Sequence, residues 1–245
     1  LILLTLHLGF SIVGWFERYQ AYLITLFVFM AVRRLPDLPW DALSRAARRR
    51  PAVAALGVAV VLVCFGSRQL IALRNTATAS NNIFAQQYQM GRFVAEQYRD
   101  RAVVVNDLGV VSLRATGPVT DLVGLGSTDV LREALRVGGR HKLTGEIVEP
   151  LLDKNGADVI ILYPDWFDKD VYGRWRAIGS WSLTGQLVTP AASTVFFYAR
   201  DERTGAELAR RLRAFEPELP TGVRVDYYQG MAATDPGSGR GAGAS

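Results

Sequence analysis

A run of apolar residues from Pro51 to about Leu73 constrains the fold of this chain more than any other feature. Its first half reads Pro-Ala-Val-Ala-Ala-Leu-Gly-Val-Ala-Val-Val-Leu-Val. An α-helix needs about 20 mainly apolar residues to cross the roughly 30 Å of hydrocarbon in a bilayer. The run therefore predicts a membrane-spanning helix that begins at Pro51, a position where proline is tolerated. A helix buried in a protein core is the alternative, although no matching apolar face follows it in the sequence.

Two more apolar stretches precede this run. The first, Leu1 to Val13, opens the chain without an initiator methionine and predicts the end of a truncated membrane helix. The second, Trp15 to Val32, is marginal in length and would use Tyr19 and Tyr22 as interfacial residues. We therefore expect residues 1–74 to be the last membrane helices of a fragment whose upstream helices are missing.

The loop between the second and third stretches predicts the orientation of the helices. Residues 33–50 contain six arginines against Asp37 and Asp41. Arginine in short loops marks the cytoplasmic side of a membrane. The prediction is a multi-pass protein of the bacterial plasma (inner) membrane, with an extracytoplasmic domain over residues 75–232 and a disordered, glycine-rich tail over residues 233–245.

The distribution of charge argues against nucleic-acid binding. The whole chain has a net charge of +5, but residues 1–74 hold nine arginines and only three acidic residues, which leaves about −1 for the remainder. A nucleic-acid-binding domain carries its basic face on the folded part. Cys64 is the one cysteine, so the chain can form neither an internal disulfide nor a thiolate metal site.

Residues 75–232 alternate short apolar runs with amphipathic stretches, which is typical of an α/β domain with a mainly parallel sheet. A buried strand is indicated where β-branched residues run continuously, as in Ala102 to Val105. The predicted strands are 102–105, 118–123, 158–163, 194–200 and 223–228. The predicted helices are 82–98, 128–136, 145–154 and 205–215, with a short helical stretch after Gly109.

Acidic residues close two of these strands. Asn106 and Asp107 follow the first strand, and Asp121 lies within the second. Ligands of open α/β sheets bind at the carboxyl ends of the strands, where two carboxylates can hold a sugar hydroxyl or a divalent cation. The alternative is structural, with Asp107 capping the next helix and Asp121 accepting from local backbone N–H groups. No cofactor is evident, and a divalent cation is expected at most in the full-length protein.

Aromatic residues gather after the third strand, in Tyr163-Pro164-Asp165-Trp166-Phe167, and Trp175 and Trp181 follow. Exposed aromatic rings in loops can stack on sugar rings, but the same residues also bury well in a core. We take Trp166 as the candidate for sugar contact.

Several segments together resemble the C-terminal region of bacterial GT-C-type membrane glycosyltransferases. The similarity extends to about residue 200 and lies in the order of these segments: Glu17–Leu23, Gln86–Met90, Val104–Gly109, Val119–Leu125, Asp158–Pro164 and Val195–Ala199.

The resemblance implies transfer of a sugar from a polyprenyl-phosphate donor to a cell-envelope glycan acceptor, in contact with membrane lipid. In that family the catalytic acid lies in an early loop, for which this chain has no match, so no catalytic residue is carried over. Arg18 and Tyr19 match a family motif, and Arg18 would approach the lipid phosphate because arginine pairs well with phosphate. A snorkelling interfacial arginine is the alternative.

The sequence is also compatible with two other functions. One is a non-enzymatic, membrane-anchored module that binds an envelope glycan or a protein partner. The other is a transporter or flippase subunit, for which intramembrane charges and broken repeats would be expected.

Overall fold

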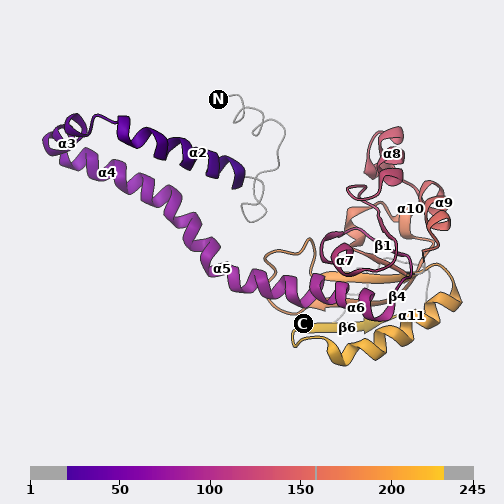
Figure 1. Ribbon diagram of the computed structural model, residues 1–245. Coiled ribbons are helices and arrows are strands. Elements are labelled where there is room, and N and C mark those ends of the chain that lie inside the picture. Colours follow the sequence, from indigo (N-terminus) through magenta and orange to yellow (C-terminus); the bar gives the residue numbers. More distant parts are fainter. Residues whose placement is uncertain (1–20, 158, 229–245) are drawn as a thin grey trace, which may run out of the picture. The chain divides into compact units, whose positions relative to one another are not determined.

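The computed structural model describes residues 21–157 and 159–228 (Figure 1). The chain divides into two compact units at Ala77, one over Leu1–Ala77 and the other over Thr78–Ser245. Each unit is described by itself. The predicted membrane helix over residues 1–13, the pair Arg18-Tyr19 and the predicted tail over 233–245 lie outside the described residues.

The described part of the first unit consists of successive helices. Helix α4 begins at Pro51, whose missing N–H costs nothing in a first turn. A π-helical turn, η2, follows it and leads into α5, whose last turns belong to the second unit. The bounds are α2 Ala21–Arg34, η1 Leu35–Asp37, α3 Trp40–Arg49, α4 Pro51–Val61, η2 Leu62–Gly66 and α5 Ser67–Ile83.

The prediction of membrane-spanning helices, and with it the multi-pass membrane location, is wrong for the described residues. Over 21–157 and 159–228, no helix combines the length and the apolar character that crossing a bilayer requires. Helix α2 has 14 residues and α4 has 11. At 1.5 Å per residue these reach about 21 Å and about 17 Å, short of the roughly 30 Å of hydrocarbon.

The predicted spanning helix is not formed because the apolar run 51–73 is divided between different helical segments. Its α-helical hydrogen-bond ladder stops at Val61, and the five residues of η2 adopt the wider π-helical turn. Helix α5 then continues through mostly polar sequence, including Asn75, Asn81 and Asn82. Continuous hydropathy in the sequence therefore does not become one continuous apolar α-helix.

The described part of the second unit contains a six-stranded sheet with the order β2-β1-β3-β5-β4-β6. Strand β1 pairs in parallel with both β2 and β3, whereas the β3–β5, β5–β4 and β4–β6 pairs are antiparallel. The strands are β1 Val103–Val105, β2 Val119–Asp121, β3 Val159–Leu162, β4 Arg176–Leu183, β5 Thr194–Ala199 and β6 Val223–Tyr227.

The domain is thus α/β, but the expectation of a mainly parallel sheet is wrong, because the sheet is mixed. Strand β4 was not predicted from the sequence, and it pairs with antiparallel neighbours on both sides. Residues 184–193 join β4 to β5 without a helix. A connection of this length suits antiparallel neighbours, since a parallel pair needs a longer crossover, usually with a helix.

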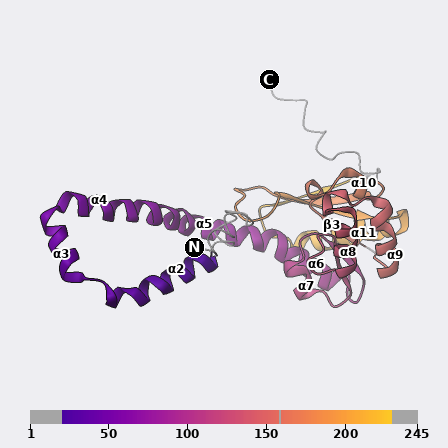
Figure 2. The ribbon, with the colours of Figure 1, turned by 90° about the horizontal axis from the view of Figure 1, so that it is seen from above.

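Helices cover both faces of the sheet (Figures 1 and 2). On one face, α6 and α11 pack through residues such as Phe93 and Leu212 against Trp181 and Phe197. On the other face, α8, α9 and α10 pack over alternate strand residues such as Ile160. The alternation follows from the period of two in a strand, which sends successive side chains to opposite faces.

Most predicted helices of this unit are found near their expected bounds. The stretch 82–98 becomes the end of α5, a π-helical turn and α6. Helix α9 ends at Asn155 and is capped by Gly156, which has a left-handed φ of 62°. The bounds are η3 Phe84–Tyr88, α6 Gln89–Gln97, α7 Gly109–Arg114, α8 Thr128–Val137, η4 Arg140–Lys142, α9 Gly145–Asn155, η5 Pro164–Trp166, α10 Lys169–Tyr172, α11 Glu202–Phe215 and η6 Glu216–Glu218.

Candidate functional site

Polar side chains meet where the parallel strands β1 and β3 end. Asn106 and Asp107 follow β1, and Tyr163 follows β3. Because β1 and β3 run in parallel, their carboxyl ends lie at one edge of the sheet. Two glutamines of η3 and one tryptophan of η5 join them. We define the carboxyl-edge site as Gln86, Gln87, Asn106, Asp107, Tyr163 and Trp166.

Asn106 joins the ends of the two strands. The backbone N–H of Tyr163 donates to Oδ1 of Asn106 at 3.0 Å, and Nδ2 of Asn106 donates to the carbonyl oxygen of Tyr163 at 3.0 Å. Asn106 is buried. Its amide therefore satisfies both backbone groups of Tyr163 at the point where the β-ladder stops.

The phenol of Tyr163 is the centre of a buried hydrogen-bond network. Its hydroxyl donates to Oε1 of Gln86 at 2.7 Å and accepts from Nε2 of Gln87 at 3.3 Å. The same Nε2 donates to Oδ2 of Asp107 at 3.2 Å. Burial, and then the negative charge of Asp107, raises the pKa of Tyr163 well above its ordinary value. Tyr163 is consequently a neutral donor and acceptor at physiological pH.

Gln87 carries an acceptor that nothing in the described structure uses. Its Oε1 is buried and has no hydrogen-bond partner among the described residues. The orientation of the amide is fixed by chemistry, since turning it over would set this oxygen against the carboxylate of Asp107. A buried acceptor without a donor costs free energy, which a donor from an ordered water or a ligand would offset.

Asp121 follows the structural alternative that the sequence left open. It is 1% exposed, and its two carboxylate oxygens accept from the backbone N–H groups of Val123 at 2.8 Å and Gly126 at 2.9 Å. Its side chain therefore shapes its own loop. The N-cap of α7 is Leu108, which makes no side-chain capping bond.

Trp166 is the predicted aromatic residue that reaches the surface. It is partly exposed, its ring centroid lies 6.1 Å from that of Tyr163, and the guanidinium carbon of the exposed Arg140 lies 5.6 Å from its ring. Trp175 and Trp181 are both buried and belong to the two cores. The structure therefore brings Asn106, Asp107 and Trp166 together around Tyr163.

The glutamines of η3 were part of the resemblance but were not predicted as site residues. Gln86 and Gln87 of η3 are buried, as are the apolar residues Phe93 and Val94 of α6, which follows η3 directly. Two adjacent polar residues on the apolar side of an amphipathic helix are a signal that sequence reasoning could have used. Across residues 21–157 and 159–228, no three or more histidine, cysteine or acidic side chains form a group that could hold a metal ion.

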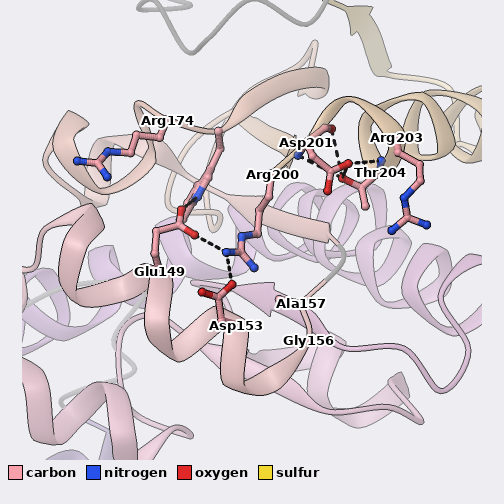
Figure 3. A pocket seen from close by; sticks show the side chains of 10 residues that line it. Glu149, Asp153, Gly156, Ala157, Arg174, Arg200, Asp201, Arg203 and Thr204 are labelled. Atoms are coloured by element: carbon pink, nitrogen blue, oxygen red, sulfur yellow. Dashed lines mark hydrogen bonds and ion pairs between the residues drawn. The ribbon is translucent and has the colours of Figure 1, made fainter.

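A second feature, a surface hollow of about 520 Å³, lies where α9, β5 and α11 meet (Figure 3). We call it the Arg200 hollow. Nη2 of Arg200 donates to Oε2 of Glu149 at 2.6 Å and to Oδ1 of Asp153 at 2.5 Å. Burial acts to lower the pKa of Arg200, but the contacts with Asp153 and Glu149 outweigh it, so the pKa is raised and the guanidinium stays charged. The lining residues are Glu149, Asp153, Gly156, Ala157, Arg174, Trp175, Arg200, Asp201, Arg203 and Thr204.

Comparison with known proteins finds a family model that matches part of the chain. A family model described as a domain of unknown function (DUF8728) matches residues 81–200. No curated protein and no solved structure matches the chain. The matched span holds every residue of the carboxyl-edge site and the five strands from β1 to β5. It ends at Arg200, before α11 and β6.

Proposed function

We propose that the α/β domain binds a glycan at the carboxyl-edge site, and that it serves as the acceptor-recognition part of an enzyme that transfers a sugar from a polyprenyl-phosphate donor. The transfer reaction comes from the resemblance in sequence to GT-C-type glycosyltransferases. The binding role comes from the site. No catalytic residue is assigned to this chain.

The observation that carries the proposal is the convergence of Asp107 and Trp166 on the Tyr163 network. A sugar ring has an apolar face and a rim of hydroxyl groups that both donate and accept. The partly exposed carboxylate of Asp107 can accept from two neighbouring hydroxyls, and a partly exposed indole can cover the apolar face. The neutral amides and phenol behind them supply donors and acceptors without adding charge.

Arg140 sets a condition on this mode of binding. Its guanidinium lies over the Trp166 ring, so a sugar that stacks on that face must displace it. Arg140 is exposed, and an exposed cation–π contact contributes only about 0.5–1 kcal/mol. The displaced guanidinium would remain close enough to donate to a sugar hydroxyl.

The test is glycan binding by the whole 245-residue chain, measured on a panel of cell-envelope and unrelated glycans. Trp166→Ala and Asp107→Asn are each expected to weaken binding about tenfold, in line with the loss of one stacking or charged contact. Trp40→Ala is the matched control, because Trp40 is an exposed tryptophan of the other unit. Binding that is equal in all three variants, or no binding to any glycan, would contradict the proposal.

A protein partner is the second candidate, and exposed leucines favour it. Leu113, Leu125 and Leu135 are 83%, 87% and 72% exposed on the second unit. Large apolar side chains with this exposure mark interaction surfaces when they are contiguous. The test places a photo-crosslinking amino acid at position 131 and measures the crosslinks to other proteins that form in cells. Leu125→Ser combined with Leu135→Ser should abolish these crosslinks, while glycan binding is unchanged.

A further inference from the structure

The Arg200 hollow has more free donors than free acceptors. Its lining carries three acidic residues and three arginines, so its formal charge is zero. The acidic groups are already engaged. Glu149 accepts from Nε1 of Trp175 at 2.5 Å and from Arg200, Asp153 accepts from Arg200, and Asp201 accepts from the backbone N–H of Thr204 at 2.8 Å.

Only one nitrogen of the Arg200 guanidinium, Nη2, donates hydrogen bonds to described residues. Both carboxylate contacts go to Nη2, and the N–H groups on Nε and Nη1 have no hydrogen bond within the described ranges. The side chain is 25% exposed. A guanidinium has five N–H donors, so Arg200 is held firmly by two carboxylates and still offers three N–H groups to a ligand.

Two further arginines line the hollow on either side of Arg200 in Figure 3. Arg203 forms no ion pair with any carboxylate of the described residues. The nearest carboxylate oxygen to Arg174 belongs to Glu146, 3.9 Å away, and both of these side chains are mostly exposed. An exposed pair at this distance contributes little, so it leaves Arg174 free to change rotamer.

We propose that the Arg200 hollow binds a phosphate group, with Arg200 as the fixed donor and Arg174 and Arg203 as the mobile ones. Arginine suits phosphate because its N–H groups are charged and fan out in one plane. The volume of about 520 Å³ exceeds what a phosphate ion fills and lies within the usual range of small-molecule sites. The phosphate group belongs either to free inorganic phosphate or to a sugar phosphate.

Phosphate binding in the Arg200 hollow does not depend on glycan binding at the carboxyl-edge site, because the two sites share no residue. The N-terminus of α11 is not part of the proposed phosphate site, since Asp201 caps that helix and already accepts from the backbone N–H of Thr204. The phosphate proposal rests on the guanidinium N–H groups that make no hydrogen bond to described residues. They surround a hollow in which each carboxylate already accepts at least one hydrogen bond.

The experiment is calorimetric titration of the whole chain with inorganic phosphate and with a hexose 1-phosphate, at low ionic strength. Arg203→Gln is expected to weaken phosphate binding about three- to tenfold, and Arg200→Gln more strongly, as expected for loss of a charge-assisted contact. Arg210→Gln is the matched control, because Arg210 is an exposed arginine of the same helix that does not line the hollow. Raising the salt concentration should weaken binding.

The outcomes separate the two sources and can overturn the proposal. Tighter binding of the hexose 1-phosphate identifies a sugar phosphate as the ligand, whereas equal affinities identify inorganic phosphate. The proposal is wrong if neither probe binds, if Arg203→Gln and Arg210→Gln weaken binding equally, or if unphosphorylated hexose binds as tightly as its phosphate. Trp166→Ala should leave phosphate binding unchanged, which keeps this test apart from the glycan test.

Discussion

Asn106 and Tyr163 are joined by two reciprocal hydrogen bonds, each 3.0 Å long, between the side-chain amide of the first and the backbone of the second. The pair links the carboxyl ends of β1 and β3, which are 57 residues apart in sequence. The geometry of the carboxyl-edge site depends on this link, because Asp107 is the next residue after Asn106 and the phenol of Tyr163 binds the glutamines.

Asn106→Ala should destabilise the protein by about 3 kcal/mol, because it removes two hydrogen bonds and leaves a buried N–H and a buried carbonyl without partners. Asn81→Ala, at an exposed position of α5, should change stability by less than about 0.5 kcal/mol. Urea unfolding followed by circular dichroism measures both. Equal stability of the two variants would show that the amide link carries no stability.

Tyr163→Phe and Tyr198→Phe should differ at neutral pH, although both phenols are buried. The Tyr163 hydroxyl contacts Gln86 and Gln87, so its loss should cost about 1–2 kcal/mol. The Tyr198 hydroxyl is buried and has no hydrogen-bond partner among the described residues, so its removal should be neutral or slightly stabilising. Urea midpoints at pH 7 decide this, and a larger loss in Tyr198→Phe would contradict it.

Alkaline pH should destabilise the protein through the same two phenols. Burial is the main cause that raises the pKa of Tyr163 and of Tyr198 in the folded state. When a folded pKa is higher than the unfolded one, the stability it contributes is complete below the unfolded pKa, near 10, and is lost as pH rises above it. Unfolding measured between pH 9 and 11.5 should be less steep in pH for each phenylalanine variant than for the parent.

Acid should destabilise the protein partly through Glu207. Hydrogen bonds from Arg211 and then Arg101 lower the pKa of Glu207, and the distance from Oε1 to Nη1 of Arg101 is 2.6 Å. A lowered folded pKa contributes stability above the unfolded pKa, near 4.5, and that stability is lost as pH falls through the folded value. Glu207→Gln should therefore lose stability at pH 7 and show a shallower fall below pH 4.5, measured by thermal unfolding.

The N-terminus of α11 should depend on Asp201. Its Oδ1 accepts from the backbone N–H of Thr204 at 2.8 Å, and the Thr204 hydroxyl completes a capping box. Asp201→Ala should cost about 1 kcal/mol, and Asp201→Ser should restore most of it because serine also caps well. Thermal unfolding distinguishes the two, and a serine variant as unstable as the alanine variant would show that capping is not the cause.

Local features of the second unit could be predicted from the sequence because they depend on neighbouring residues. The β-branched run at Val103–Val105 forms a strand, and Asn155-Gly156 ends α9, since glycine adopts a left-handed φ readily. The position of Asn106 and Asp107 at the end of β1 was also predictable. The partners of these residues were not, because Gln87 lies 20 residues from Asp107 and Tyr163 lies 76 residues from Gln87.

Two predictions about the secondary structure failed, one for a local reason and one for a long-range reason. The apolar run 51–73 predicted one membrane-spanning helix, but the π-helical turn Leu62–Gly66 divides it. Strand β4 was missed because Ala177, Gly179, Ser180 and Ser182 give it a weak β-propensity on its own. It forms because β5 and β6 supply hydrogen bonds on both of its sides.

The sequence by itself determined most helices of the second unit and five of its six strands, all but β4, and that two acidic residues close β1 and β2. The tertiary structure alone decided what those residues do. Asp121 accepts from its own loop and Asp107 from a glutamine of a distant helix, while Arg200 is held by two carboxylates of α9. The physical reason is that secondary structure follows from the local spacing of side chains, whereas hydrogen-bond partners are chosen by packing between elements far apart in the chain.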